Sequence, residues 1–103
     1  MINVSVLYPK SDETKFDLDY YCANHIPLVT ERFGALCKRI EVNVGVTDPT
    51  SGSEPPHMVI AHMYFDSLQD FQAAFGPHAQ EIMGDIKNYT NVQPVIQYSD
   101  VRG

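Results

Sequence analysis

Four stretches of the chain repeat apolar positions every second residue, which is the spacing of a β-strand. These stretches are residues 2–8, 38–46, 57–65 and 91–98. The third is apolar on both faces apart from His62, as in a strand that is covered on both sides. On the first strand, one face is predicted to carry Ile2, Val4, Val6 and Tyr8. On the last strand, one face is predicted to carry Val92, Ile96 and Tyr98.

A helix is predicted to begin at Asp17, a favourable N-cap, with Phe16 and Tyr21 placed to form a hydrophobic staple. Pro27 lacks an amide hydrogen, so a kink is expected just after His25, and Gly34 is the expected end. The inward stripe of this helix is predicted to contain Leu18, Tyr21, Cys22, His25 and Val29.

A second helix is predicted to begin after Ser67, which has Asp70 at the acidic position of a capping box. Gly76 and Pro77 interrupt its pattern, and Pro77 suits the first turn of a further helical segment. The residues predicted to share its buried side are Leu68, Phe71, Phe75, His78 and Ile82.

The order of these elements predicts an α+β, ferredoxin-like βαββαβ fold with a four-stranded antiparallel sheet, in one domain over residues 1–103. In this topology both helices cover the same face of the sheet, and the other face stays bare. Since the third strand is apolar on both sides, we expect a second copy to cover that face in a homodimer. The alternative is a monomer with a small exposed patch.

Charge and cysteine content narrow the choice of partners. The net charge of −6 disfavours nucleic acid, and no apolar run is long enough to cross a membrane. The N-terminus enters a strand pattern with no signal-type segment, so a cytoplasmic location is expected. Cys22 and Cys37 have no metal or redox spacing and are expected to be free thiols.

His25 is the strongest candidate for chemistry. It lies one turn after Tyr21 on the inward stripe and just before the expected kink, where a cavity can open between helix and sheet. An imidazole there can transfer a proton near neutral pH, while Tyr21 holds it or orients a substrate oxygen. The alternative is that both residues are core groups, with the imidazole bonded to a backbone carbonyl.

Four further residues are candidates for ligand binding. His62 and Tyr64 lie two apart on the third strand, so both point to the same face. On the helix side they would line the cavity of His25, and on the other side they would belong to the dimer interface. Asn88 and Tyr89 lie in the turn before the last strand and are predicted to rim the pocket.

No metal site or cofactor is predicted. The four histidines and two cysteines are widely scattered and lack the short spacings of metal-binding motifs. No glycine-rich fingerprint follows a strand, so nothing indicates a nicotinamide or flavin site. A haem can be held by one histidine, but the sequence singles none out for that role.

Residues 16–29, FDLDYYCANHIPLV, resemble the FDxDYYxxxHxPLV signature of the EthD family. Residues 61–68, 71–75 and 84–90 are similar to the family's third strand, its second helix and its link into the last strand. The resemblance covers nearly the whole chain and implies a dimeric α/β-barrel. The family is named for a protein linked to ethyl tert-butyl ether degradation, and some fungal relatives are similar to decarboxylases or dehydratases of aromatic polyketides.

Three hypotheses for function follow. The first is a cofactor-free enzyme in which His25 is the acid–base and Tyr21 the orienting group, acting on a small, partly apolar substrate by isomerisation, dehydration or decarboxylation. The second is a non-catalytic accessory protein that carries a small hydrophobic molecule in the same cavity. The third is a structural dimer whose cavity is filled.

Overall fold

Four antiparallel strands form one open sheet in the computed structural model, which describes residues 1–103. Their order across the sheet is β2-β3-β1-β4, so the first strand lies between the third and the last. This is the ferredoxin-like arrangement predicted from the sequence. The strands are β1 (Ile2–Pro9), β2 (Cys37–Val44), β3 (His57–Phe65) and β4 (Val95–Asp100).

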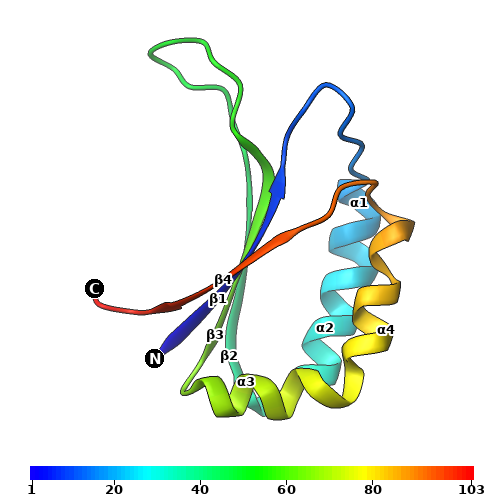
Figure 1. Cartoon of the computed structure of the whole chain (residues 1–103), viewed down its shortest axis with the longest axis vertical. Coiled ribbons are helices and arrows are strands. Elements are labelled where there is room, and N and C mark those ends of the chain that lie inside the picture. Colours follow the sequence, from blue (N-terminus) through cyan, green and yellow to red (C-terminus); the bar gives the residue numbers. More distant parts are fainter.

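Two helical runs lie on the same face of the sheet, and the opposite face is uncovered (Figure 1). Arg32 and Glu81 form an ion pair, with Nε 2.7 Å from Oε1, that joins the two runs. None of the helices is long and apolar enough to pass through a membrane. The first run contains α1 (Leu18–Tyr20), η1 (Tyr21–His25), α2 (Ile26–Phe33) and η2 (Gly34–Leu36), and the second contains α3 (Leu68–Phe75), η3 (Gly76–His78), α4 (Ala79–Gly84) and η4 (Ile86–Asn88).

The predicted ends of the helices are confirmed. A side-chain oxygen of Asp17 accepts the Tyr20 amide at 3.0 Å, and the Ser67 hydroxyl accepts the Asp70 amide at 3.1 Å. Phe16 packs on Tyr21 with ring centroids 5.1 Å apart, as a hydrophobic staple requires. Gly34 ends α2 at a φ of +59°, a backbone conformation that residues with a Cβ rarely adopt.

A π-helical turn, η1, lies where the kink after His25 was expected. In an α-helix, the ring of Pro27 would collide with the carbonyl of Ala23. The chain instead widens over Tyr21–His25, where the amide of Ile26 donates to the Tyr21 carbonyl five residues back. The helical run therefore continues past Pro27, and His25 lies on a turn of a type that often occurs at functional sites.

Four smaller expectations need correction. Cys22, predicted to lie on the inward stripe of the first helix, is exposed. The last strand begins at Val95 rather than at residue 91, because Pro94 has no amide to donate to a neighbouring strand. The second strand covers Cys37–Val44 rather than residues 38–46. Leu68 is 46% exposed, although its spacing suits the buried side of α3, because it lies in the first turn of that helix.

The uncovered face of the sheet is more polar than the third strand alone suggests. Ser5 on β1 pairs with His62 on β3, which also pairs with Glu41 on β2. The neighbouring row across the same face contains the apolar pair Leu7 and Ile60. This face therefore carries a polar row beside a row in which Leu7 and Ile60 lie next to Asn43, because β1 and β2 contribute polar side chains to it.

Candidate functional site

A set of long-range hydrogen bonds joins the start of α1 to the segment after η4. The amide of Asp17 donates to the Tyr89 carbonyl at 2.7 Å, and the Thr90 hydroxyl donates to the Lys15 carbonyl at 2.6 Å. The Lys15 amide in turn donates to Oδ1 of Asn91 at 2.8 Å. These bonds hold the segment around residue 85 against η1, although the two are about sixty positions apart in the sequence.

His25 and Asp85 meet at this junction. Nδ1 of His25 lies 2.9 Å from Oδ2 of Asp85, and His25 is only 5% exposed. The other carboxylate oxygen of Asp85 accepts hydrogen bonds from the Tyr20 hydroxyl at 2.7 Å and from the side-chain amide of Asn88 at 2.9 Å. The carboxylate therefore has donors on both oxygens, which fixes the orientation of the imidazole.

The protonation of the pair follows from its surroundings. Burial lowers the pKa of His25 below its usual value, although Asp85 acts in the opposite direction. Burial raises the pKa of Asp85, but the hydrogen bonds from Asn88, Tyr20 and His25 outweigh it and hold that pKa below its usual range. At neutral pH the pair is therefore a carboxylate and a neutral imidazole, so Nδ1 carries the proton and Nε2 is the nitrogen that accepts.

Two tyrosines contact the imidazole, and a third, Tyr8, contacts both of them. Tyr21 stacks on His25, with ring centroids 5.4 Å apart and an interplanar angle of 17°. The hydroxyl of Tyr89 lies 3.4 Å from Nε2 of His25 and 2.7 Å from the hydroxyl of Tyr8. Burial raises the pKa of all three phenols above the usual value, so each keeps its proton at neutral pH.

His25, Tyr8 and Tyr21 line a cavity of about 70 Å³ between the sheet and the helices. Its wall contains no Lys, Arg, Asp or Glu. The remaining lining residues are almost all apolar and come from β1, β3, β4 and both helical runs, including Val4, Val29, Ala61, Met63, Phe71 and Ile96. The cavity is thus an uncharged, apolar space with one imidazole and a few phenol groups in its wall.

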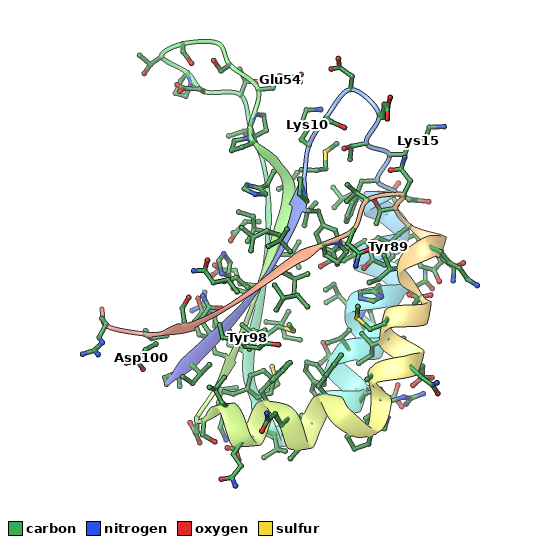
Figure 2. All side chains as sticks on the ribbon, viewed as in Figure 1. Lys10, Lys15, Glu54, Tyr89, Tyr98 and Asp100 are labelled. Atoms are coloured by element: carbon green, nitrogen blue, oxygen red, sulfur yellow. The ribbon has the colours of Figure 1, made fainter.

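The outer wall of the cavity lies between β4 and α4. Met83 and Tyr98 line the cavity and are also 40% and 51% exposed, so they separate it from solvent. Figure 2 shows Tyr98 on β4 and Tyr89 at the end of the helix layer where α1 begins. Because Met83 is unbranched and flexible, this wall is the part of the cavity that adapts most readily to a ligand.

The structure brings together only some of the residues predicted for the site. His25 and Tyr21 line the cavity as expected. Tyr89 is buried against His25 instead of lying at the rim, and Asn88 contacts the site through Asp85. Both positions follow from the long-range bonds that hold this segment against η1.

His62 and Tyr64 lie on the uncovered face of the sheet, away from His25. Nδ1 of His62 is 3.1 Å from the side-chain amide of Asn3 and 3.2 Å from the Ser5 hydroxyl. The Arg39 guanidinium lies over the Tyr64 ring, 5.9 Å from its centroid. Of the two placements considered from the sequence, this is the one on the side away from the helices.

Sequence reasoning does not identify Asp85 or Tyr8 as site residues. Asp85 follows α4 in a segment with no recognisable catalytic spacing, and its partner His25 is sixty residues earlier. Tyr8 is predicted to share a face of the first strand with Val4 and Val6, but nothing in its local pattern distinguishes a core phenol from a functional one. Only the tertiary contacts reveal the two roles.

The fold and this cavity define a ferredoxin-like α+β protein with a buried aspartate–histidine pair beside an apolar cavity. Residues 9–93 match the family model of the EthD domain. The chain therefore belongs to the EthD domain family, as its FDLDYYCANHIPLV segment indicates.

The chain is similar to a curated sequence and to solved structures, of which the one below 25% identity shows the fold alone. An EthD-like protein from Ralstonia eutropha JMP134 has a TM-score of 0.90 and 39% identity, covering 96% of this chain and 89% of that one. An uncharacterised 11.0 kDa protein from the thcB-thcC intergenic region of Rhodococcus erythropolis is 27% identical, covering 97% of this chain and 94% of its own. A dimeric protein of unknown function and ferredoxin-like fold from Bacteroides fragilis NCTC 9343 has a TM-score of 0.52 and 12% identity, covering 97% and 94%.

Proposed function

We propose that this protein is a cofactor-independent enzyme that transfers protons within a small, partly apolar substrate, with His25 as the acid–base. The observation that carries the proposal is the Asp85–His25 pair, with Nδ1 2.9 Å from the carboxylate, in the wall of an uncharged cavity. Asp85 fixes the tautomer that leaves Nε2 as the base, and the stacked Tyr21 ring holds the imidazole plane.

The same arrangement supports both halves of a proton-transfer cycle. When Nε2 accepts a proton, the imidazolium that forms lies against the Asp85 carboxylate, which stabilises its charge. The apolar wall excludes water and strengthens that interaction. The proton can then return to another atom of the same substrate, which gives isomerisation, or assist the loss of water or carbon dioxide.

The test is solvent proton exchange. Small uncharged ketones such as cyclopentanone are incubated with the protein in D2O, and deuteration of their C–H groups is followed by proton NMR. The wild-type rate is expected to exceed that of His25→Gln by about a hundredfold, the lower contribution of a positioned base. His78→Gln is the matched control, since His78 lies outside the cavity. Equal rates in wild type and His25→Gln would reject the catalytic role.

The apolar lining also favours a second function, carriage of a small hydrophobic molecule without chemistry. The two functions differ in what His25 contributes. A carrier binds fluorobenzene equally well in wild type and His25→Gln and deuterates no ketone in either form. An enzyme shows the exchange difference even where the affinities of the two proteins agree.

We also propose that two copies pair through their uncovered sheet faces, as the EthD-family barrel implies. The face has no cover within one chain (Figure 1), and Oδ1 of Asn3 is buried on it without a hydrogen-bond partner. A facing copy supplies both a cover for Leu7 and Ile60 and donors for that oxygen. The Bacteroides fragilis relative described as dimeric adds support from its fold.

Light scattering after size exclusion tests the pairing. The wild-type protein is expected to have twice the chain mass of 11.6 kDa. Ile60→Glu places a charge in the centre of the face and is expected to give the single-chain mass. Val46→Glu, in the exposed loop before β3, is the control that leaves the mass unchanged. A wild-type protein of single-chain mass would refute the pairing. The cytoplasmic location stays a prediction.

A further inference from the structure

We infer that Tyr8 is the residue that receives a hydrogen bond from the ligand, and that the ligand is an uncharged molecule with a hydrogen-bond-donating group. Tyr8 lines the cavity and is joined through Tyr89 to His25 and Asp85 in one continuous hydrogen-bonded chain. This inference rests on the proposed function and names its substrate class and a further catalytic residue.

Asp85 sets which group donates and which accepts in each hydrogen bond of this series. A carboxylate only accepts hydrogen bonds, so His25 must donate from Nδ1 and must accept at Nε2. The group opposite Nε2 is the Tyr89 hydroxyl, which therefore donates to the imidazole at 3.4 Å. Having used its one proton there, the Tyr89 oxygen accepts from the Tyr8 hydroxyl at 2.7 Å.

Tyr8 is then left with no proton to offer. Its oxygen also interacts with the Tyr21 hydroxyl, which leaves it one lone pair for a further donor, and Tyr89 is not in the cavity wall. Both nitrogens of His25 are already engaged, by Asp85 and by Tyr89. Of the groups in the hydrogen-bonded series from Asp85 through His25 and Tyr89, only the Tyr8 oxygen both faces the cavity and has an acceptor position left, so it is the acceptor through which a ligand is linked to His25.

The charge of the lining limits the ligand further. No Lys or Arg reaches the cavity, so a carboxylate or phosphate would be buried there without a counter-charge. A cationic ligand would likewise find no carboxylate in the wall, because Asp85 lies behind His25. The lining suits a compact, largely apolar molecule that offers one hydroxyl group or one acidic C–H group, and because the cavity holds about 70 Å³, a ring such as phenol requires the wall at Met83 to move outward.

Proton transfer along these hydrogen bonds conserves the number of protons and the total charge. The bond from the ligand to its proton breaks as that proton joins the Tyr8 oxygen. The original Tyr8 proton passes to Tyr89, and the Tyr89 proton passes to Nε2 of His25. The ligand becomes an anion, and His25 becomes an imidazolium beside the Asp85 carboxylate. Nothing is oxidised or reduced, and both phenols end with one proton each.

Paired probes test the hydrogen bond. Phenol donates a hydrogen bond and is uncharged at pH 7.5, whereas fluorobenzene has nearly the same shape and no donor. Their affinities are measured from backbone amide shifts of cavity residues such as Val29 and Ala61. Wild type is expected to bind phenol about threefold to tenfold more tightly than fluorobenzene, the worth of one net hydrogen bond. Benzoate, which is charged, is expected not to bind.

Tyr8→Phe is expected to remove the preference for phenol while fluorobenzene still binds, which also shows that the cavity is intact. Tyr64→Phe is the matched control, because Tyr64 loses the same hydroxyl but lies on the uncovered face of the sheet, away from the cavity. In that variant the ratio of the two affinities should stay as in wild type. A ratio near one in wild type, or a preference that persists in Tyr8→Phe, would overturn the inference.

A second measurement covers the case in which Tyr8→Phe does not fold. In the wild-type protein, phenol should shift the Nε2 resonance of His25 through the chain, and fluorobenzene should leave it unmoved. Absence of that shift with phenol bound would also overturn the inference. The deuterium-exchange comparison of wild type with His25→Gln is independent of these outcomes, so the proposed function can survive when the role of Tyr8 fails.

Discussion

Asp85→Asn tests the hydrogen-bond geometry of the site most directly. Oδ1 of Asp85 accepts from Tyr20 and Asn88, whereas Oδ2 accepts from Nδ1 of His25. An asparagine that keeps its oxygen on Tyr20 and Asn88 turns its NH2 group toward His25, so two donors face each other. We expect the imidazole to resolve this conflict by moving its proton from Nδ1 to Nε2.

The stability cost follows from the bond that is exchanged. A hydrogen bond to a charged group contributes about 1.5–3 kcal/mol and its neutral replacement about 0.5–1.5 kcal/mol, which leaves a loss of about 1–2 kcal/mol. In a domain of this size, each kcal/mol lowers Tm by about 4–8 °C. Asp85→Asn is therefore expected to melt about 4–16 °C below wild type at pH 7.5.

Nitrogen-15 spectra of the imidazole rings report the tautomer, and calorimetry reports Tm. Asp66→Asn is the control, because Asp66 is an exposed carboxylate 3.7 Å from Lys38, and such a pair contributes at most about 1 kcal/mol. The reasoning is refuted if His25 keeps its proton on Nδ1 in Asp85→Asn, or if both variants melt at the same temperature.

Three further predictions concern stability. As the pH falls from 7.5 to 5.5, His25 becomes protonated in the unfolded chain below about pH 6.5, whereas burial keeps it neutral in the folded protein. The free energy of unfolding, measured in urea, should therefore fall in wild type and should fall less in His25→Gln. Gly45→Ala should cost about 1–3 kcal/mol, because the new Cβ would meet the His57 carbonyl oxygen and lie 2.8 Å from Pro55; an unchanged urea midpoint would contradict this. Phe65→Ala should cost about 3–5 kcal/mol by the same measurement, since Phe65 is fully buried in the core, and a loss below about 1 kcal/mol would contradict that placement.

Local patterns were sufficient for most of the fold. The alternation in residues 2–8 and the apolar run in residues 57–65 locate β1 and β3 closely, because strand spacing is written in adjacent residues. Asp17 and Ser67 mark their helix starts, because capping depends on a side chain and an amide three residues on. Where the governing contact is local, the sequence predicts it.

The parts that escaped prediction depend on contacts between distant residues or on choices between neighbouring geometries. Pro27 predicts a disturbed helix but does not distinguish a kink from the π turn that forms. The residues after η4 bind the start of α1 instead of extending the last strand, so β4 begins late. Asp85 becomes the partner of His25 only through that same contact, and no spacing in the sequence indicates it.

The position of these partners bears on when the site can form during synthesis. Asp85 and Tyr89, which hold both ring nitrogens of His25, belong to the last fifth of the chain. β4 comes later still, and it closes the cavity by pairing with β1, the first strand to be made. A nascent chain released after β3 therefore has His25 but neither the carboxylate that orients its imidazole nor a closed cavity. The hydrogen-bonded geometry around His25 can form only when synthesis is nearly complete.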